Sequence, residues 1–250
     1  MTEKSCGSPE ISVIIPAFNE EALLAATLAS VADALRQCGV GEQSEVIVVD
    51  NNSTDRTADI AVQHGATVVF EPKNQISRAR NAGGQVAMGT YLLFLDADTE
   101  LPAELLQRAL LNLRSNKCCG GGVVLQMDRS VSAGMSRAVA AWNGIAVKLG
   151  LAAGCFIYCR REGFGAVGGF SNKVYAGEEI WFSRALKKWG RKQGLKFIVI
   201  SDIVISTSSR KLEWFSSWQL LFQTLILFLF PWATYSRRLC RIWYHRPDDR

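Results

Sequence analysis

The strongest constraint on the fold is an alternation of short apolar runs with longer amphipathic stretches in the first hundred residues. The runs are nearly continuous in Val, Ile, Leu and Phe, which is typical of strands buried on both faces. The stretches between them place apolar side chains at three- and four-residue steps, the period of a helix with one buried face. Strands are predicted over 11–15, 45–49, 66–70 and 91–95, and helices over 20–37, from about 55 onward and over 76–88. Such alternation indicates βαβ units, so we predict an α/β, doubly wound and mostly parallel sheet with helices on both faces.

The second half of the chain is less regular. Helices are predicted over 102–115, 132–149 and 178–189, and strands over 119–127, 155–160 and 197–205. The stretch 163–170 is rich in Gly and aromatic residues, and we assign it no helix. Near residue 55, Ser53 or Thr54 is predicted to cap the second helix.

The predicted order of strands and loops already indicates where a ligand binds. In open α/β sheets ligands bind beyond the carboxyl ends of the strands, where the strand order reverses. Polar groups follow three of the predicted strands, at 16–20, 50–53 and 96–98. We expect these three clusters to converge on one crevice.

The net charge of +5 conceals a division between the two parts of the chain. Residues 1–100 hold 14 Asp and Glu against six Lys and Arg, whereas residues 101–250 hold nine against 22. The acidic part is expected to hold any metal and the basic part to face anions. The segment 184–196 has six cationic residues and no acidic one. Without a zinc-finger, RRM or basic-zipper pattern, anionic lipid headgroups or a phosphorylated substrate fit this charge better than nucleic acid does.

Composition limits the class of protein. With 48% apolar and 20% charged residues, the chain is globular, which excludes a disordered, collagen-like or disulfide-scaffold protein. Its seven cysteines are odd in number and include no CxxC pair. We therefore expect free thiols and a cytoplasmic location, with no secretory leader.

The C-terminal part of the chain is apolar and then basic. Residues 218–233 are 16 positions without a charge, fewer than the roughly 20 apolar residues that cross a bilayer. Trp and Tyr flank this stretch and Arg237, Arg238 and Arg241 follow it, which favours an apolar helical appendage at the membrane interface. A buried core helix, an oligomer contact and a single spanning helix are the alternatives. We therefore divide the chain into a domain at 1–212 and an appended segment at 213–250.

Asp96 and Asp98 are the sharpest chemical feature. Residues two apart in an extended chain point the same way, so both carboxylates can face one divalent cation. Hard oxygen ligands suit Mn²⁺ or Mg²⁺, which keep open positions for substrate phosphates. By itself such a pair is also common in ordinary turns and caps.

Four segments, taken together, resemble the family-2 glycosyltransferases. They are Ile14–Glu20, Val48–Thr57, Ser77–Gly83 and Phe94–Asp98, which occur in the family's order and spacing. The resemblance covers about residues 11–190. It implies a GT-A fold, with a half at 11–100 that binds the nucleotide sugar and a half at 101–212 that binds the acceptor. It also implies inverting transfer from a UDP-sugar, or alternatively a GDP-sugar.

The resemblance assigns roles to individual residues. It places Phe18 near the nucleobase, Asp50 at the uracil N3–H, Arg80 near the base and phosphates, Asp96 at the ribose and Asp98 on the metal. Glu20 would fix the base or ribose. Each residue taken singly has a simpler interpretation: a core aromatic for Phe18, a first-turn helix residue for Glu20, a turn acid for Asp50 and a surface cation for Arg80. The full set expected at the donor nucleotide is Pro16, Ala17, Phe18, Glu20, Asp50, Asn52, Arg80, Asp96 and Ala97.

The acceptor half resembles the family more loosely. Gly165–Phe170 matches a Gly-Gly-Phe segment below the acceptor site, and Glu179 occupies the usual position of the Asp that deprotonates the acceptor hydroxyl. Its neighbour Glu178 occupies the partner position, and either glutamate can be the base. Two acids at a helix start also simply favour the helix dipole.

The chain departs from many GT-A enzymes after the last strand. Where those enzymes have a metal-binding His, this chain has Ser206–Arg210. Metal binding would then rely on Asp98, the diphosphate and water, with Arg210 or Lys211 near the leaving phosphate.

These assignments predict an inverting glycosyltransferase of cell-envelope glycan or glycolipid synthesis, acting on an acceptor hydroxyl or lipid phosphate. A catalytically silent nucleotide-sugar-binding or membrane-associated scaffold is the alternative from another class. A nucleotidyltransferase is disfavoured because its Gly-rich, Lys-containing first loop is missing. A dehydrogenase is disfavoured because no GxGxxG follows the first strand.

Overall fold

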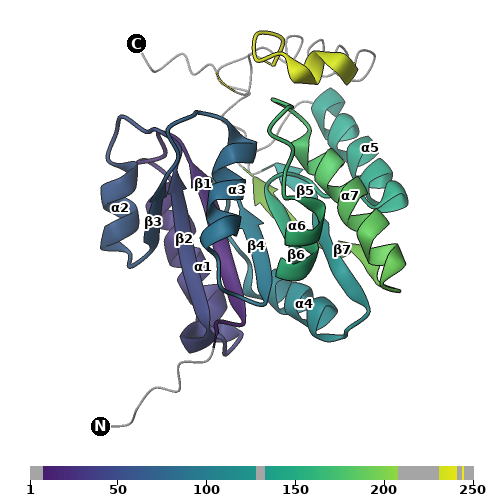
Figure 1. Cartoon of the computed structure of the whole chain (residues 1–250), viewed down its shortest axis with the longest axis horizontal. Coiled ribbons are helices and arrows are strands. Elements are labelled where there is room, and N and C mark those ends of the chain that lie inside the picture. Colours follow the sequence, from purple (N-terminus) through teal and green to yellow (C-terminus); the bar gives the residue numbers. More distant parts are fainter. Residues whose placement is uncertain (1–7, 128–132, 208–230, 241–243, 245–250) are drawn as a thin grey trace.

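The computed structural model describes residues 8–127, 133–207, 231–240 and 244 (Figure 1). The strands are β1 Ile11–Ala17, β2 Ser44–Asp50, β3 Thr67–Phe70, β4 Tyr91–Leu95, β5 Cys118–Met127, β6 Phe156–Arg160 and β7 Lys196–Thr207. The α-helices are α1 Leu24–Gln37, α2 Thr57–Gln63, α3 Ile76–Val86, α4 Ala103–Arg114, α5 Ala133–Leu149, α6 Arg161–Val167 and α7 Glu178–Lys192. Two short 3-10 helices complete the described elements, η1 Gly41–Gln43 and η2 Pro231–Tyr235.

The strands form one seven-stranded sheet in the order β3-β2-β1-β4-β6-β5-β7. Parallel pairs join β1 to β2, β2 to β3, β1 to β4 and β5 to β7. The strand β6 runs antiparallel to both β4 and β5. The strand order therefore reverses between β1 and β4, and the predicted doubly wound, mostly parallel sheet is confirmed.

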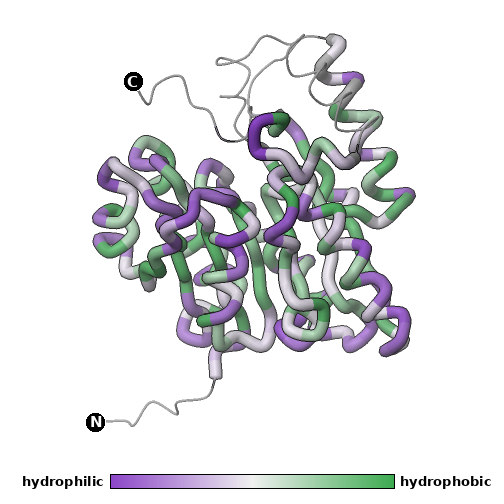
Figure 2. Tube along the Cα trace, turned by 45° about the horizontal axis from the view of Figure 1, so that its top comes forward, coloured by the Kyte–Doolittle hydropathy of each residue, from purple (hydrophilic) through white to green (hydrophobic). Residues whose placement is uncertain are grey.

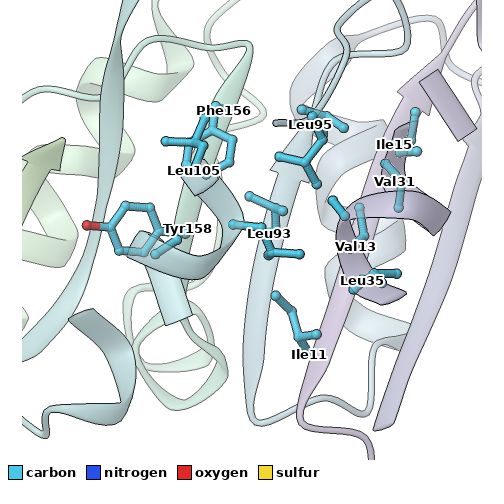
Figure 3. Packing of buried hydrophobic residues seen from close by; sticks show 14 of the residues in the cluster. Ile11, Val13, Ile15, Val31, Leu35, Leu93, Leu95, Leu105, Phe156 and Tyr158 are labelled. Carbon is cyan, nitrogen blue, oxygen red and sulfur yellow. The ribbon is translucent and has the colours of Figure 1, made fainter. Parts of the chain in front are cut away.

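Helices cover both faces of this sheet because successive side chains on each strand enter different cores. On β1, Val13 and Ile15 belong to a core with α1, α2 and α4, whereas Ile14 belongs to a second core with α3, α6 and α7. Figure 3 shows the first core, where Val31 and Leu35 of α1 meet β1 and β4. Fully burying one such aliphatic side chain contributes roughly 1.5–3 kcal/mol.

The helix α3 lies unusually close to the sheet. A Cβ built on Gly83 would lie 2.4 Å from Cγ2 of Ile14 and 2.9 Å from Cγ2 of Val49. A Cβ on Gly84 would lie 2.5 Å from Cζ of Phe164 in α6. Two glycines thus let α3 fit between the sheet and α6, and this contact sets the height of Arg80 above the strands.

Several predicted helix ends are wrong. The helix α1 begins at Leu24, four residues after the predicted start, and the N–H of Glu20 before it donates to Oγ1 of Thr57 at 2.8 Å. The helix α2 begins at Thr57, whose N–H donates to Asp55 Oδ1 at 2.9 Å, so neither Ser53 nor Thr54 is the cap. The helix α6 was not predicted; it ends at Val167, and the next residue, Gly168, is left-handed with φ +76°.

The C-terminal segment is described only in part. Most of the predicted apolar helix at 218–233 lies outside the described residues, and its last positions form η2. The N–H of Tyr175 donates to the carbonyl of Thr234 at 2.7 Å, so this segment packs on the loop before α7. None of the helices in the described ranges combines the length and apolarity needed to cross a bilayer. The six cysteines within those ranges are free thiols, as expected.

Candidate active site

The candidate site lies at the carboxyl ends of β1, β2 and β4, beside the reversal in strand order. The loops after these strands carry the three polar clusters that the sequence predicts. Since β1 pairs with both β2 and β4, the three clusters are neighbours, as expected for a doubly wound sheet.

Hydrogen bonds join the loops after β1 and β2. The N–H of Asn19 donates to Ser53 Oγ at 3.0 Å, and Asn19 Oδ1 accepts from the N–H of Thr54 at 2.8 Å. Asn19 and Asn52 both have positive φ, 50° and 68°, a backbone conformation that Asn tolerates better than most residues. The two loops therefore form one rigid wall of the site.

The predicted donor residues after β1, β2 and β4 lie at different depths. Ala17, Glu20, Asp50 and Ala97 are buried, Pro16 and Phe18 are half-buried, and Asn52 is exposed. Asp50 Oδ1 accepts from the N–H of Ser53 at 2.9 Å, so the turn-acid interpretation of this residue is confirmed. Interpreting Glu20 as a first-turn helix residue is wrong, since α1 begins at Leu24.

Asp96 and Asp98 follow β4. Asp96 Oδ1 accepts from Arg80 Nη2 at 2.9 Å, and about a third of the Asp96 side chain is exposed. Asp98 is half-buried. The carbonyl of Ala97 between them accepts from Thr27 Oγ1 at 2.8 Å, which ties this loop to α1.

These residues fit a divalent cation that is only partly bound by protein. Among the described residues, no group of three His, Cys, Asp or Glu side chains could enclose a metal. A single carboxylate at Asp98 suits Mn²⁺ or Mg²⁺, which commonly bind through one or two carboxylates plus water and substrate phosphates. A structural zinc site, which needs four protein ligands, does not fit.

Arg80 of α3 is the buried centre of the site, at 1% exposure. Its Nη1 donates to Glu178 Oε1 at 2.6 Å and its Nη2 donates to Asp96 and to the carbonyl of Gly154 at 2.7 Å. The guanidinium also lies 5.4 Å from the ring centre of Phe170. Asp96 and Glu178 keep the pKa of Arg80 raised against the opposing effect of burial. The surface-cation interpretation of Arg80 is therefore wrong.

Glu178 and Glu179 begin α7 directly after Gly177, which is left-handed with φ +70°. Glu178 is 4% exposed and pairs with Arg80, whereas Glu179 is half-buried. Burial, and then the charge of Glu178, raise the pKa of Glu179 to about 8, although Arg80 acts to lower it. Of the two glutamates, Glu179 is more accessible to an acceptor and holds a proton more tightly than an ordinary carboxyl group.

Aromatic packing fixes the position of α7. Phe94 of β4 meets Phe170 edge-on, with ring centres 5.0 Å apart, and Phe170 stacks on Phe182 of α7 at 4.3 Å. Phe170 belongs to the predicted Gly-Gly-Phe segment. Its N–H and carbonyl both bond to the side chain of Asn81 in α3, at 2.8 Å each. The segment below the acceptor side is thus held by the same helix that carries Arg80.

The sequence did not predict this role for Asn81, nor the link from Arg80 to Glu178. The sequence does hold a clue to Asn81, because it directly follows Arg80 within the segment Ser77–Gly83. For the link there is no local signal, because the partners are 98 positions apart. Arg210 and Lys211, expected near the leaving phosphate, lie outside the described residues.

A family model described as glycosyl transferase family 2 matches residues 12–167, more than half of the chain. The chain belongs to glycosyl transferase family 2. The predicted family is confirmed, and the enzyme class that this family implies is that of a glycosyltransferase.

One relative in this family is an uncharacterised glycosyltransferase of Mycobacterium tuberculosis. It is 37% identical over 103 residues, which cover 41% of this chain and 43% of the relative. This chain thus matches less than half the length of this curated relative.

Two solved structures share the fold. A mannosyltransferase of Pyrobaculum calidifontis, in complex with GDP-Man and Mn²⁺, has a TM-score of 0.62 at 23% identity, over 80% of this chain and 57% of that one. The S. aureus protein TarS 1-349, in complex with UDP, has a TM-score of 0.62 at 20% identity, over 80% and 60%. These likenesses, with the seven-stranded sheet, confirm the predicted GT-A fold.

Proposed function

We propose that this glycosyltransferase moves a sugar from a nucleoside diphosphate sugar to an acceptor hydroxyl or lipid phosphate in cell-envelope glycan or glycolipid synthesis. UDP-sugars are the first candidates as donor and GDP-sugars the second. Support comes from the wall of donor residues after β1 and β2, and from structural neighbours crystallised with UDP and with GDP-Man. We assign the donor to residues 11–100 and the acceptor to residues 101–212.

One observation carries the proposal: a single buried guanidinium joins an acid of the donor half to an acid of the acceptor half. Arg80 bonds Asp96 at the end of β4 and Glu178 at the start of α7. The donor held near Asp96 and an acceptor held near α7 would therefore meet. Fixing two reactants in this way is a large part of catalysis by proximity.

The proposed reaction is a single displacement. Glu179 takes the proton of the acceptor hydroxyl, whose oxygen forms a bond to the anomeric carbon. The bond from that carbon to the donor phosphate breaks, the nucleoside diphosphate leaves, and the anomeric configuration inverts. Asp96 orients the ribose side of the donor, and Arg80 positions Asp96 and Glu178 without itself reaching the reacting atoms.

Asp98 would hold a Mn²⁺ or Mg²⁺ ion together with the donor diphosphate, and this cation would offset the charge on the leaving group. Phe18, Glu20 and Asp50 would hold the base and ribose, beside Pro16, Ala17, Asn52 and Ala97. The bound nucleotide would thus lie along the joined loops after β1 and β2.

The class of acceptor decides whether a base is needed at all. A sugar hydroxyl must lose its proton during attack, whereas a phosphate monoester, with a second pKa near 6, is already ionised at neutral pH. Replacing Glu179 by Gln, which has nearly the same shape, should therefore abolish transfer to a hydroxyl and largely spare transfer to a lipid phosphate.

The test is to supply purified protein with UDP-glucose, UDP-N-acetylglucosamine or GDP-mannose, Mn²⁺ and a panel of lipid-linked and sugar acceptors. We expect acceptor-dependent release of nucleoside diphosphate. The variant Glu179→Gln should bind the donor as well as the wild type and lose turnover on hydroxyl acceptors. Absence of donor binding in the wild type with every nucleotide would contradict the proposal.

We further propose a cytoplasmic location with peripheral attachment to the membrane through residues 213–250. The uncharged run at 218–233 and the arginines after it support this attachment. Removing residues 214–250 should shift the protein from the membrane fraction toward the soluble fraction. An unchanged distribution would leave the oligomer contact as the better interpretation of this segment.

A further inference from the structure

Two neighbouring helices in the acceptor half expose an unusual combination of side chains. On α5, Ile145 is 45% exposed and Leu149 51%. On α7, Trp181 is 39% exposed, and the cations Arg184, Lys188 and Arg191 are exposed beside it. We call these six side chains the α5–α7 surface.

The two helices lie side by side. The Nζ of Lys187 in α7 donates a hydrogen bond to the carbonyl of Leu149, the last residue of α5. A Cβ built on the next residue, Gly150, would lie 3.3 Å from the same Nζ. Figure 1 and Figure 2 show α5 and α7 next to each other along one edge of the molecule, with hydrophobic positions in α5 near the hydrophilic end of α7.

The fold determines which side of α5 faces outward. The side chain of Asn143 bonds both the N–H and the carbonyl of Leu125 in β5, each at 2.9 Å, and Ala146 is buried. This side is therefore fixed on the sheet. Ile145 and Leu149 are four positions apart and share another side of the helix, where they remain exposed.

The cations of α7 also share one side. Arg184, Lys188 and Arg191 are separated by four and three positions, which is one stripe along the helix. The guanidinium of Arg184 lies 5.7 Å from the ring centre of Trp181. The chain has no Asp or Glu at 133–149 or at 180–196, so these two segments supply no carboxylate to neutralise the stripe.

We propose that the α5–α7 surface binds the surface of an anionic lipid bilayer. Cations attract acidic headgroups, Trp prefers the headgroup level, and exposed aliphatic side chains gain by entering the acyl boundary. A soluble polyanion such as nucleic acid would use the cations and leave Ile145 and Leu149 in water. The bilayer is the partner that uses all three kinds of side chain.

This contact would orient the enzyme on the membrane. The helix α7 begins with Glu178 and Glu179, and Arg191 follows Glu179 by 12 residues, roughly 18 Å along the axis. The site would then lie within reach of a lipid-linked acceptor. This last step rests on the function proposed above, whereas the binding of lipid stands without it.

The experiment is vesicle flotation with the full-length protein. The probes are vesicles of phosphatidylcholine alone and vesicles that also contain phosphatidylserine. One variant, Lys188→Glu/Arg191→Glu, reverses two cations of the surface, and another, Ile145→Ser/Leu149→Ser, removes two apolar side chains. The matched control, Arg36→Glu/Lys117→Glu, makes the same change in net charge at two exposed positions outside α5 and α7. Melting temperature and UDP binding are measured for every variant, so that loss of folding is distinguished from loss of lipid binding.

We expect the wild type and the control to float with the anionic vesicles, more weakly as salt increases. Affinity should fall at least about tenfold in the charge-reversal variant and clearly in the apolar variant. Three outcomes would overturn the proposal: no vesicle binding by the wild type, equal binding by all variants, or equal binding to vesicles without phosphatidylserine. Loss of heparin binding in the charge-reversal variant, without vesicle binding in the wild type, would indicate a soluble polyanion instead. Failure of glycosyl transfer with intact vesicle binding would contradict only the proposed function.

Discussion

The Nη1 atom of Arg80 lies 2.6 Å from Oε1 of Glu178, and both side chains are almost completely excluded from water. A charge in such a place is tolerated only when it is paired and hydrogen-bonded. The pair therefore connects α3, packed against β1 by Gly83, to the first turn of α7. It fixes the neighbouring Glu179 relative to the loops after β1 and β2, where the proposed donor residues lie.

Replacing Arg80 by Met should destabilise the protein by roughly 3–5 kcal/mol, because Glu178 would be left as a buried charge without its partner. Equilibrium unfolding in urea measures this loss. The control is Arg36→Met, which breaks the exposed pair of Arg36 with Asp33 and should cost less than about 1 kcal/mol. Equal effects of the two substitutions would show that the buried pair contributes no more than a surface pair.

If Glu179 is the general base, activity should rise with pH through its raised pKa, about 8, since only the ionised carboxylate accepts a proton. The variant Glu178→Gln removes the like charge that helps to raise this pKa and keeps an oxygen for Arg80. In this variant the rise of kcat/KM with pH, measured on a hydroxyl acceptor, should occur at lower pH. Glu162→Gln, an exposed change in α6 with the same loss of charge, should leave the profile unmoved.

The same raised pKa has a consequence for stability that needs no substrate. Burial and Glu178 hold the pKa of Glu179 above the ordinary carboxyl value, so the native state binds this proton more tightly than the unfolded state. Its contribution to stability is full below the unfolded pKa, near 4.5, and is lost as pH rises through about 8. Compared with wild type, Glu179→Gln should therefore lose less stability over this range in urea unfolding. Parallel pH dependence in the two proteins would refute the raised pKa.

The sheet was predictable because each of its first four strands is an apolar run followed by a turn-forming or acidic residue, a local pattern. The helix α6 was missed because four glycines in and just after it masked a short helix that tertiary contacts stabilise, chiefly Phe164 against Gly84. The depth of Arg80 was also not predictable, since a cation on an amphipathic helix normally faces water. Only the fold brings Asp96 and Glu178, which lie on different elements, to the same guanidinium.

Two glycines in helices should respond in opposite ways to replacement by Ala. At Gly83 the added Cβ would overlap Ile14 and Val49, so Gly83→Ala should destabilise by roughly 1–3 kcal/mol. At Gly144 on α5 a Cβ would meet no atom within 4 Å, so Gly144→Ala should stabilise by roughly 0.5–1 kcal/mol through helix propensity. Urea unfolding of both variants tests the close approach of α3 to the sheet. A neutral or stabilising Gly83→Ala would contradict it.

The last prediction concerns the cation. If Asp98 is the protein ligand of Mn²⁺ or Mg²⁺ at the donor diphosphate, UDP should raise the melting temperature of the wild type much more with the metal than with EDTA. A nucleotide at 100 times its Kd adds about 2.7 kcal/mol to stability. In Asp98→Ala the metal-dependent part of this shift should vanish, whereas Glu100→Ala, an exposed change two residues later, should keep it. Asp96 is paired with Arg80, and no cluster of three potential metal ligands exists among the described residues. We therefore expect no other described side chain to replace Asp98 as the ligand. A full metal-dependent shift in Asp98→Ala would mean that the nucleotide and water alone hold the cation, and Asp98 would lose its assigned role.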